Sequence, residues 1–323
     1  MKTNQNTYDY EDPIVSVVLP AFNEEETIEK AITSIKNQNY DNNLVEIIVV
    51  DNNSTDRTRT IAENQSVRVH FLEHGPVGKV RNTGAELAKG RILFFLDADC
   101  IAPNDWIRNG VSQIIKNENI VLGGGYELRK EPKALEKLWL LDGPNGALLP
   151  KDLLGGSIAI SKSTFKKAGG FDETVTSGED SLLSKSLRKL GCTVKIDRKM
   201  SVTHLGNPTS FYSFLKRQIW HSENYLRNFR EDLKDPTLIL TLFFLFSVAL
   251  TIILVALRSE FLAFSATASI LTPSILSIKR IWRSKNYKHI LSFHKIYLVD
   301  LVYMIGRTIG LLKGVSSKIR KLK

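Results

Sequence analysis

The sequence predicts an α/β fold over its first 237 residues and a pair of membrane-spanning helices after them. From residue 14 to about residue 99, short apolar β-branched runs alternate with longer amphipathic stretches, which is typical of strands and helices that follow one another in a sheet. At residue 238 a run of 20 residues without a charged side chain begins. Charge changes at the same place: residues 238–323 carry 13 Lys and Arg against 2 Asp and Glu, and residues 1–237 carry 31 against 32.

The first half of the predicted domain reads as alternating strands and helices. Ile28, Ile32 and Ile35 recur at helical spacing, and Ser54 is a candidate N-cap. We expect strands at 14–20, 45–51, 67–73 and 91–97, and helices at 24–38, 54–65 and 81–90. The strands are apolar on both faces, as in a buried parallel sheet with right-handed crossovers. Residues 14–120 therefore predict a Rossmann-like, nucleotide-binding half.

Polar residues end three of these strands. Pro20, Asp51 and Asp97 lie at predicted carboxyl ends, where ligands of such sheets bind. Asp97 and Asp99 form a D-x-D after an apolar run that would bury them unless something paired them. Carboxylates are hard oxygen ligands that suit Mg²⁺ or Mn²⁺ bridging to a diphosphate. A solvated acidic turn is the alternative.

Residues 121–237 are predicted to form a mixed-sheet half that receives the second substrate. A helix ends at Gly191, and its apolar positions are expected to pack inward. These positions are Leu182, Leu183, Leu187 and Leu190. Residues 1–13 form a polar tail without an apolar run, so we expect no cleavable signal peptide and a cytoplasmic catalytic domain.

Two apolar runs predict a transmembrane hairpin. Residues 238–257 and 261–278 are each about long enough to cross a hydrocarbon core of roughly 30 Å, and Pro273 is a candidate kink. Basic residues before and after the pair place both ends in the cytoplasm. Residues 296–312 carry Asp300 and Arg307 on one face, which favours an interfacial helix in a basic segment, 279–323, over a third span.

The composition also limits the classes of binding partner. Positive charge gathers beside apolar segments instead of covering the folded domain, which favours membrane lipid and argues against nucleic acid. Cys100 and Cys192 are too few and too far apart for a disulfide framework, so we interpret them as reduced structural thiols.

Four segments together resemble the family 2 glycosyltransferases of GT-A fold. They are "VSVVLPAFNEEETI", "IIVVDNNSTDRT", "VRNTGAELAKGRILFFLDAD" and "GGFDETVTSGEDSLLSKSLRKLG", and the resemblance covers residues 14–220. It implies that Asp99 ligates a divalent cation and that Asp97 contacts the ribose or nucleotide. It also implies that Asp51 accepts a hydrogen bond from the base. Ala21, Asn23 and Glu24 would line the same pocket beside Pro20, and the Arg81 guanidinium would suit a pyrophosphate.

The resemblance assigns further roles in the second half. Asp180, last residue of "GED", would be the general base, although an acidic pair at a helix N-terminus is also favourable in itself. His204 would complete the metal shell or be structural. Gly155 and Gly156 would form a turn that lets substrate approach. The segment "KRQIWH" departs from the Q-x-x-R-W signature of processive members, which argues against polymer synthesis. Its residues Arg217 and Gln218 would still reach the diphosphate.

The implied reaction is inverting transfer of a sugar from a nucleotide-diphosphate sugar to a hydroxyl of a glycan or lipid-linked acceptor at the cytoplasmic membrane. One alternative is a polyprenyl-phosphate sugar synthase, whose ionised acceptor needs no general base. The other is a non-catalytic membrane scaffold that retains the fold. Intact Asp97, Asp99 and Asp180 argue against loss of catalysis.

Overall fold

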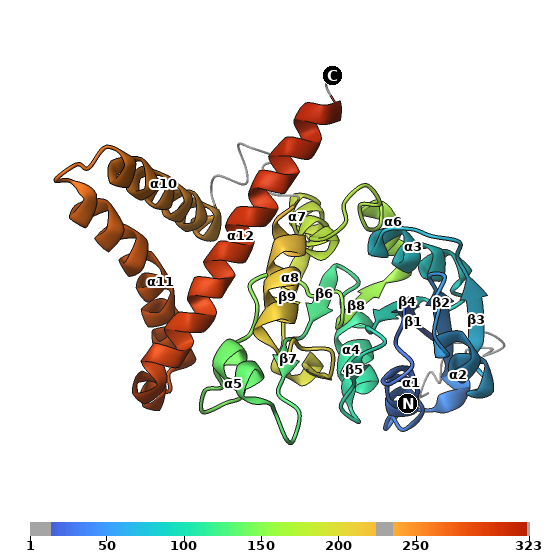
Figure 1. The fold of residues 1–323 in the computed structure, drawn as a ribbon. Coiled ribbons are helices and arrows are strands. Elements are labelled where there is room, and N and C mark those ends of the chain that lie inside the picture. Colours follow the sequence, from blue (N-terminus) through green and yellow to red (C-terminus); the bar gives the residue numbers. More distant parts are fainter. Residues whose placement is uncertain (1–13, 224–234, 322–323) are drawn as a thin grey trace. The chain divides into compact units, whose positions relative to one another are not determined.

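The computed structural model describes residues 14–223 and 235–321 (Figure 1). The predicted polar tail, 1–13, and the basic residues expected just before the first span lie outside the described residues. The chain forms two compact units. The sheet unit holds the described part of Met1–Tyr126, with Leu149–Val175 and Glu179–Gly206; the helical unit holds Glu127–Leu148, Thr176–Gly178 and the described residues from Asn207 onward. These units divide the second half differently from the predicted boundaries at residues 120 and 237.

The sheet unit is built on a seven-stranded mixed sheet in the order β3-β2-β1-β4-β8-β6-β9. The strands are β1 (Val15–Ala21), β2 (Val45–Asp51), β3 (Arg68–Phe71), β4 (Ile92–Phe95), β6 (Ile120–Gly123), β8 (Ile158–Ser161) and β9 (Thr193–Ile196). The first four are mutually parallel, whereas β8 runs antiparallel to β4 and β6. A small second sheet contains β5 (Cys100–Ile101), β10 (Val202–His204) and β7 (Tyr126–Glu127). The predicted mixed α/β sheet is confirmed.

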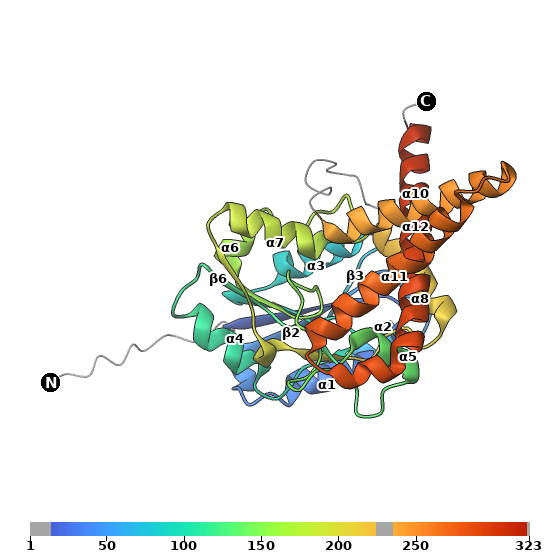
Figure 2. The ribbon, with the colours of Figure 1, turned by 90° about the vertical axis from the view of Figure 1, so that its left-hand side faces the viewer.

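Helices cover both faces of the large sheet (Figure 2). On one face lie α1 (Ile28–Lys36), α2 (Thr58–Asn64) and α4 (Trp106–Ile114); on the other lie α3 (Val77–Leu87), α6 (Lys162–Lys167) and α7 (Glu179–Lys189). Successive strand residues point to opposite faces, so Val17 and Leu19 pack with the first set and Val18 with the second. Apolar burial on both sides leaves the strand ends as the place for polar chemistry.

Several local expectations in this unit were wrong, among them the start of α3, which begins at Val77 and not at Arg81. Helix α2 begins at Thr58 and not at Ser54, because the Ser54 Oγ instead accepts the Asn23 N–H at 3.0 Å. Leu190 is 54% exposed, since α7 ends one residue before it, whereas Leu183 and Leu187 are buried as expected.

The helical unit contains α5 (Ala134–Leu140), α8 (Phe211–Ser222), α10 (Pro236–Ala256), α11 (Leu262–Ser284) and α12 (Phe293–Lys321). Within the described residues, α10 and α11 are the two helices long and apolar enough to cross a membrane, and they form the predicted hairpin (Figure 1). Hydroxyl groups link them: the Ser269 Oγ donates to the Ser247 Oγ at 3.1 Å. Small polar contacts of this kind are common between membrane helices. Helix α11 continues through Pro273 to Ser284.

The predicted interfacial helix is part of the longer α12. Gly306, Gly310 and Gly314 face α8 so closely that a Cβ on Gly310 would come within 2.1 Å of the Ser222 Oγ. Other α12 residues, among them Tyr303 and Met304, are buried in the unit's core, so protein covers much of its apolar surface. Leu298, Ile305 and Leu312 remain exposed at intervals of seven residues. Contact between this stripe and lipid stays a prediction.

Candidate active site

The carboxyl ends of β1 and β2 form the first part of the site. Parallel pairing places Pro20 beside Val50 and Ala21 beside Asp51. The loop after β1 is fixed, because the Asn23 side-chain oxygen accepts the Thr55 N–H at 2.8 Å while Asn23 itself adopts a positive φ of 56°. Asp51 is 1% exposed, and its Oδ1 has no hydrogen-bond partner among the residues that the structure describes. A buried acceptor of this kind suits a ligand donor, as predicted for a base.

The end of β4 delivers Asp97 into a buried ionic network. Arg81, from α3, is 3% exposed; its Nη2 lies 2.6 Å from Asp97 Oδ1 and its Nη1 lies 2.5 Å from Glu179 Oε1. Tyr126 donates its hydroxyl to Asp97 Oδ2 at 3.3 Å. The guanidinium also lies over the Phe171 ring, 5.4 Å from its centroid. Arg81, which is predicted to contact the pyrophosphate, is thus engaged by two carboxylates, and its contact with a pyrophosphate stays a prediction.

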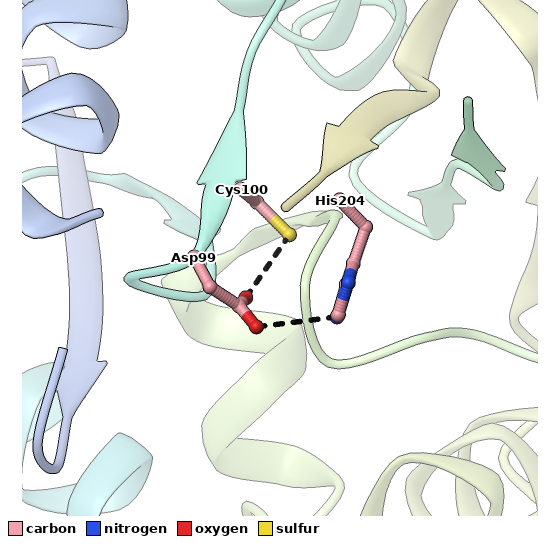
Figure 3. A group of neighbouring side chains, drawn as sticks. All are labelled: Asp99, Cys100 and His204. Carbon is pink, nitrogen blue, oxygen red and sulfur yellow. Dashed lines mark hydrogen bonds and ion pairs between the residues drawn. The ribbon is translucent and has the colours of Figure 1, made fainter. Parts of the chain in front are cut away.

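Asp99, two residues after Asp97, lies next to His204 (Figure 3). Antiparallel pairing of β5 with β10 sets His204 opposite Cys100, and His204 Nε2 lies 3.4 Å from Asp99 Oδ2. The Cys100 thiol lies 3.6 Å from the other Asp99 oxygen. Neighbouring ligand atoms on an octahedral ion with bonds of about 2.1 Å lie roughly 3 Å apart. The spacing and chemistry of the Asp99 and His204 atoms therefore fit the predicted divalent cation.

Glu24 adds evidence of excess negative charge beside this pair. Burial, reinforced by the charge of Asp99 and more weakly by that of Asp97, raises the pKa of the Glu24 carboxyl to about 7, although the hydrogen bond from Thr27 opposes the shift. Carboxylates that disfavour one another's ionised form are a favourable setting for a cation, which would relieve their repulsion.

Asp180 lies at the start of α7, next to the glycine turn. Its Oδ2 accepts the Gly155 N–H at 3.1 Å and its Oδ1 accepts the Ser181 N–H at 2.7 Å. Burial, reinforced by the charge of Glu179, raises the pKa of Asp180 to about 7 although Arg81 opposes the shift. A carboxylate with that pKa is suited to take up a proton near neutral pH.

The glycine turn is shaped by its neighbours. A Cβ on Gly155 would lie 2.2 Å from Arg81 Nη2, and one on Gly156 would lie 2.8 Å from Asp97 Oδ2. Both positions therefore require glycine for close approach of the ionic network.

Two predicted donor residues belong to the helical unit. Arg217 and Gln218 lie on α8, where Gln218 is 2% exposed and packs beneath Gly306. Their contact with a diphosphate stays a prediction.

Sequence reasoning missed three members of the cluster. The sequence indicates Glu179 only as part of an acidic pair at a helix N-terminus and predicts no role for Tyr126. It predicts Cys100 as a reduced structural thiol, and the structure shows a free, buried cysteine beside Asp99. Glu179 and Asp97 lie far apart in sequence but share Arg81. The "GED" segment could have indicated Glu179. The sequence around Tyr126 contains no pattern that predicts its place in the site.

Comparison with known proteins gives a consistent result. Residues 16–165 match the family model described as glycosyl transferase family 2. The chain is 37% identical over 122 residues to the glycosyltransferase AglE of Haloferax volcanii, covering 36% of this chain and 40% of that protein. It is 35% identical over 127 residues to the UDP-Glc:alpha-D-GlcNAc-diphosphoundecaprenol beta-1,3-glucosyltransferase WfgD of Escherichia coli, covering 36% and 47%. The matches thus span about half the length of these relatives or less.

Solved structures share the fold. A mannosyltransferase from Pyrobaculum calidifontis in complex with GDP-Man and Mn²⁺ superimposes with a TM-score of 0.61 at 18% identity, over 97% of this chain and 89% of that one. GalNAc-T7 with UDP, GalNAc and Mn²⁺ gives a TM-score of 0.50 at 18% identity, over 71% and 52%.

Proposed function

We propose that this chain, whose residues 16–165 match the glycosyl transferase family 2 model, transfers a sugar from a nucleotide-diphosphate sugar to a hydroxyl acceptor. The observation that carries the proposal is the convergence, in one unit, of a base-like carboxylate, Asp180, with the Asp99–His204 pair at the carboxyl edge of the sheet. These are the two functions that glycosyl transfer needs: proton removal from the acceptor and neutralisation of a leaving diphosphate.

The donor is proposed to bind along the ends of β1, β2 and β4. Asp51 offers its buried oxygen to the nucleotide base, with Pro20, Ala21, Asn23 and Glu24 around it. Asp97 is held for the ribose by Arg81 and Tyr126. Asp99 and His204 would hold Mg²⁺ or Mn²⁺, and this ion supplies charge neutralisation at the diphosphate when bound. The Mn²⁺ present in the two solved structures of similar fold supports a divalent cation here.

The proposed chemistry is a single displacement with inversion. Asp180 removes the proton of the acceptor hydroxyl while that oxygen forms a bond to the anomeric carbon. The bond from that carbon to the diphosphate breaks at the same time, and its electron pair leaves with the nucleotide diphosphate. The Gly155 N–H orients the base, and the absence of a side chain at Gly155 and Gly156 keeps the carboxylates and Arg81 close. Arg81 acts through Asp97 and Glu179, with which its two terminal nitrogens pair.

The acceptor is proposed to be a lipid-linked or cell-surface glycan precursor at the cytoplasmic membrane face. The two apolar helices support membrane attachment by their length and composition, and the name of WfgD describes a diphosphoundecaprenol-linked acceptor for that relative. In this proposal the sheet unit binds the donor, residues 121–237 contribute to the acceptor side, and both ends of the hairpin face the cytoplasm.

The proposal is tested with the full chain in detergent or nanodiscs, incubated with a panel of nucleotide-diphosphate sugars and lipid-linked acceptors. Release of nucleotide diphosphate that requires Mg²⁺ or Mn²⁺ and stops in excess chelator is expected. Asp99→Asn should reduce turnover by at least ~10²-fold, because an amide is a poorer hard-metal ligand and transition-state charge is left unbalanced. Asp105→Asn, at an exposed carboxylate outside the site, is the matched control.

The alternatives have distinct signatures in the same assay. Transfer to a polyprenyl phosphate that survives Asp180→Asn would identify a polyprenyl-phosphate sugar synthase. Absence of turnover with every donor, together with nucleotide binding, would identify a scaffold. Full turnover in chelator would remove the metal from the proposal.

A further inference from the structure

A short basic and aromatic turn includes the last residues of α11 in the helical unit and continues beyond them. We define it as residues 282–291, "WRSKNYKHIL". Helix α11 ends at Ser284, and Lys285 adopts a left-handed φ of 55° while its N–H bonds to the Trp282 carbonyl at 3.2 Å. The 3₁₀ helix η3 (Tyr287–Ser292) comes next.

The turn is held in one conformation by a neighbouring carbonyl. Asn286 donates its side-chain amide to the Asp142 carbonyl at 3.2 Å, and His289 Nε2 lies 2.9 Å from the same oxygen. Gly143 lies so close to Ser284 that a Cβ would approach its carbonyl oxygen to 2.2 Å. The backbone course of this segment is therefore set by polar contacts on its inner side.

Large apolar side chains project from this fixed turn. Trp282, Tyr287, Ile290 and Leu291 are 68%, 60%, 58% and 84% exposed. They continue a line of exposed apolar residues on α11 that includes Ile275 and Ile278. Exposed apolar side chains gathered on one surface usually mark a site of contact with a partner or a membrane.

The charge of the segment identifies the partner. Arg283, Lys285 and Lys288 are exposed within the turn, and residues 261–299 contain no Asp or Glu. The neighbouring Arg280 is different, because it pairs with Asp300 and donates to the Leu138 and Trp139 carbonyls. Cations interleaved with Trp and Tyr, one turn beyond an uncharged run that ends at Ile278, match the composition of a membrane interface.

We propose that the turn 282–291 docks on anionic phospholipid headgroups of the membrane that the α10–α11 hairpin enters. Trp282 and Tyr287 lie at headgroup depth, Ile290 and Leu291 reach the acyl boundary, and the three cations contact lipid phosphates. The turn thereby fixes the depth and tilt of the helical unit. The proposal rests on the membrane attachment of the hairpin proposed above and does not depend on the catalytic function.

The test uses the full chain in nanodiscs, with Leu291→Cys carrying an environment-sensitive fluorophore in a Cys192→Ser background; the remaining Cys100 is buried. Nanodiscs contain phosphatidylcholine alone or a mixture with phosphatidylglycerol, each with or without lipid that carries a quencher near the headgroup. Quenching and a blue shift that increase with phosphatidylglycerol are expected. The same label at Ile115→Cys, a 64% exposed apolar position in the sheet unit, should show neither change.

The charge contribution is measured in the labelled protein with Arg283→Gln, Lys285→Gln and Lys288→Gln together. Each cation near an anionic surface is worth about 1 kcal/mol, or about fivefold in local occupancy, so the phosphatidylglycerol dependence should disappear. Lys30→Gln, Lys116→Gln and Lys151→Gln together, at exposed positions of the sheet unit, should leave it unchanged.

Three results would overturn the proposal. A label at position 291 that stays open to aqueous iodide in both lipids would show that the turn does not reach the membrane. Protection from iodide without quenching by lipid would identify a protein partner or a second copy. Equal quenching in both lipids, unaffected by the triple Gln change, would show apolar contact without recognition of anionic headgroups.

Discussion

Two arginines, the buried Arg81 of the sheet unit and the partly buried Arg280 of the helical unit, use carboxylates in different ways. In the helical unit, Arg280 pairs with Asp300, whose second oxygen accepts the Ser277 hydroxyl at 2.7 Å, and the rest of the guanidinium meets backbone carbonyls. In the sheet unit, Arg81 pairs with both Asp97 and Glu179. Arg280 and Asp300 form a structural ion pair without net charge. Arg81 lies among more carboxylates than its single charge can neutralise.

The difference shows how a structural ion pair is distinguished from a site. Burial lowers the pKa of Arg81, but the charges of Asp97 and Glu179 outweigh burial and raise it above its ordinary value. Even so, the pKa values of Glu24 and Asp180 remain raised, and Asp51 Oδ1 is buried without a partner among the described residues. Unbalanced negative charge and a buried acceptor without a described partner are the features that we propose a ligand and a cation to complete.

The largest expected effect separates chemistry from binding within the sheet unit. Asp180→Asn should lower transfer by about 10²–10⁴-fold, because the amide cannot accept the acceptor proton. Affinity for the nucleotide diphosphate should be retained, since the proposed donor contacts lie elsewhere.

Calorimetric titration measures this, with Asp97→Asn as the comparison. That variant should lose donor affinity, because its partner is the nucleotide. Equal loss of binding in both variants would show that Asp180 belongs to the donor site or to the fold.

The two arginines themselves give the next effect. Arg81→Met and Arg280→Met each leave buried carboxylate charge uncompensated, which costs about 3–5 kcal/mol when a buried pair is broken. Chemical unfolding measures the loss. In the protein that remains folded, Arg81→Met should also lower donor affinity and turnover. Arg280→Met should lower stability but leave donor affinity unchanged. Loss of donor binding in both variants would contradict the distinction drawn between them.

The pH dependence of turnover tests the charge imbalance around Asp180. The pKa of Asp180 is raised to about 7, so its ionised, proton-accepting form is complete above that pH and falls as pH decreases. We expect kcat/KM to decline about tenfold per unit below pH 7 and to level above it, since a single group must be ionised. A profile that is flat down to pH 5 would remove Asp180 as the titrating base.

A smaller effect is expected from the glycine turn. Gly155→Ala places a methyl group 2.2 Å from Arg81 Nη2, so the guanidinium must shift or the turn must open. Overpacking of this kind typically costs about 1–3 kcal/mol. Thermal unfolding measures it, and Gly169→Ala is not a suitable control because that residue has a φ of 83°. The control is Ala168→Ser at the C-cap of α6, which makes a similar change of volume without that strain.

The smallest change in stability should come from replacing both Arg280 and Asp300. Arg280→Met with Asp300→Leu removes both charges, and such exchanges are often close to neutral. The double variant should therefore recover most of the stability that Arg280→Met alone loses. A double variant as unstable as the single one would show that the bonds from Arg280 to the Leu138 and Trp139 carbonyls carry the effect.

The sequence predicted those features that short-range patterns encode. Strand and helix alternation, Asp51 and Asp97 at strand ends, and the hairpin around residue 259 follow from runs of a few to some twenty residues, because burial and membrane crossing act on contiguous segments. Boundaries that depend on a single competing hydrogen bond were less accurate, as at Ser54, which bonds to Asn23 and does not begin α2.

Only the tertiary structure decided how the site is joined. Insertion of β8 between β4 and β6, antiparallel to both, carries the Gly155–Gly156 turn to Arg81, and pairing of β5 with β10 carries His204 to Asp99. Arg81 meets Glu179 across 98 positions of sequence. No periodicity records such a contact, because its energy arises from two charges buried together by the packing of separate elements and not from any preference of the residues beside them. The sequence by itself determined which chemical groups stand at the sheet's edge, and the fold determined which of them neutralise one another and which are left for a ligand.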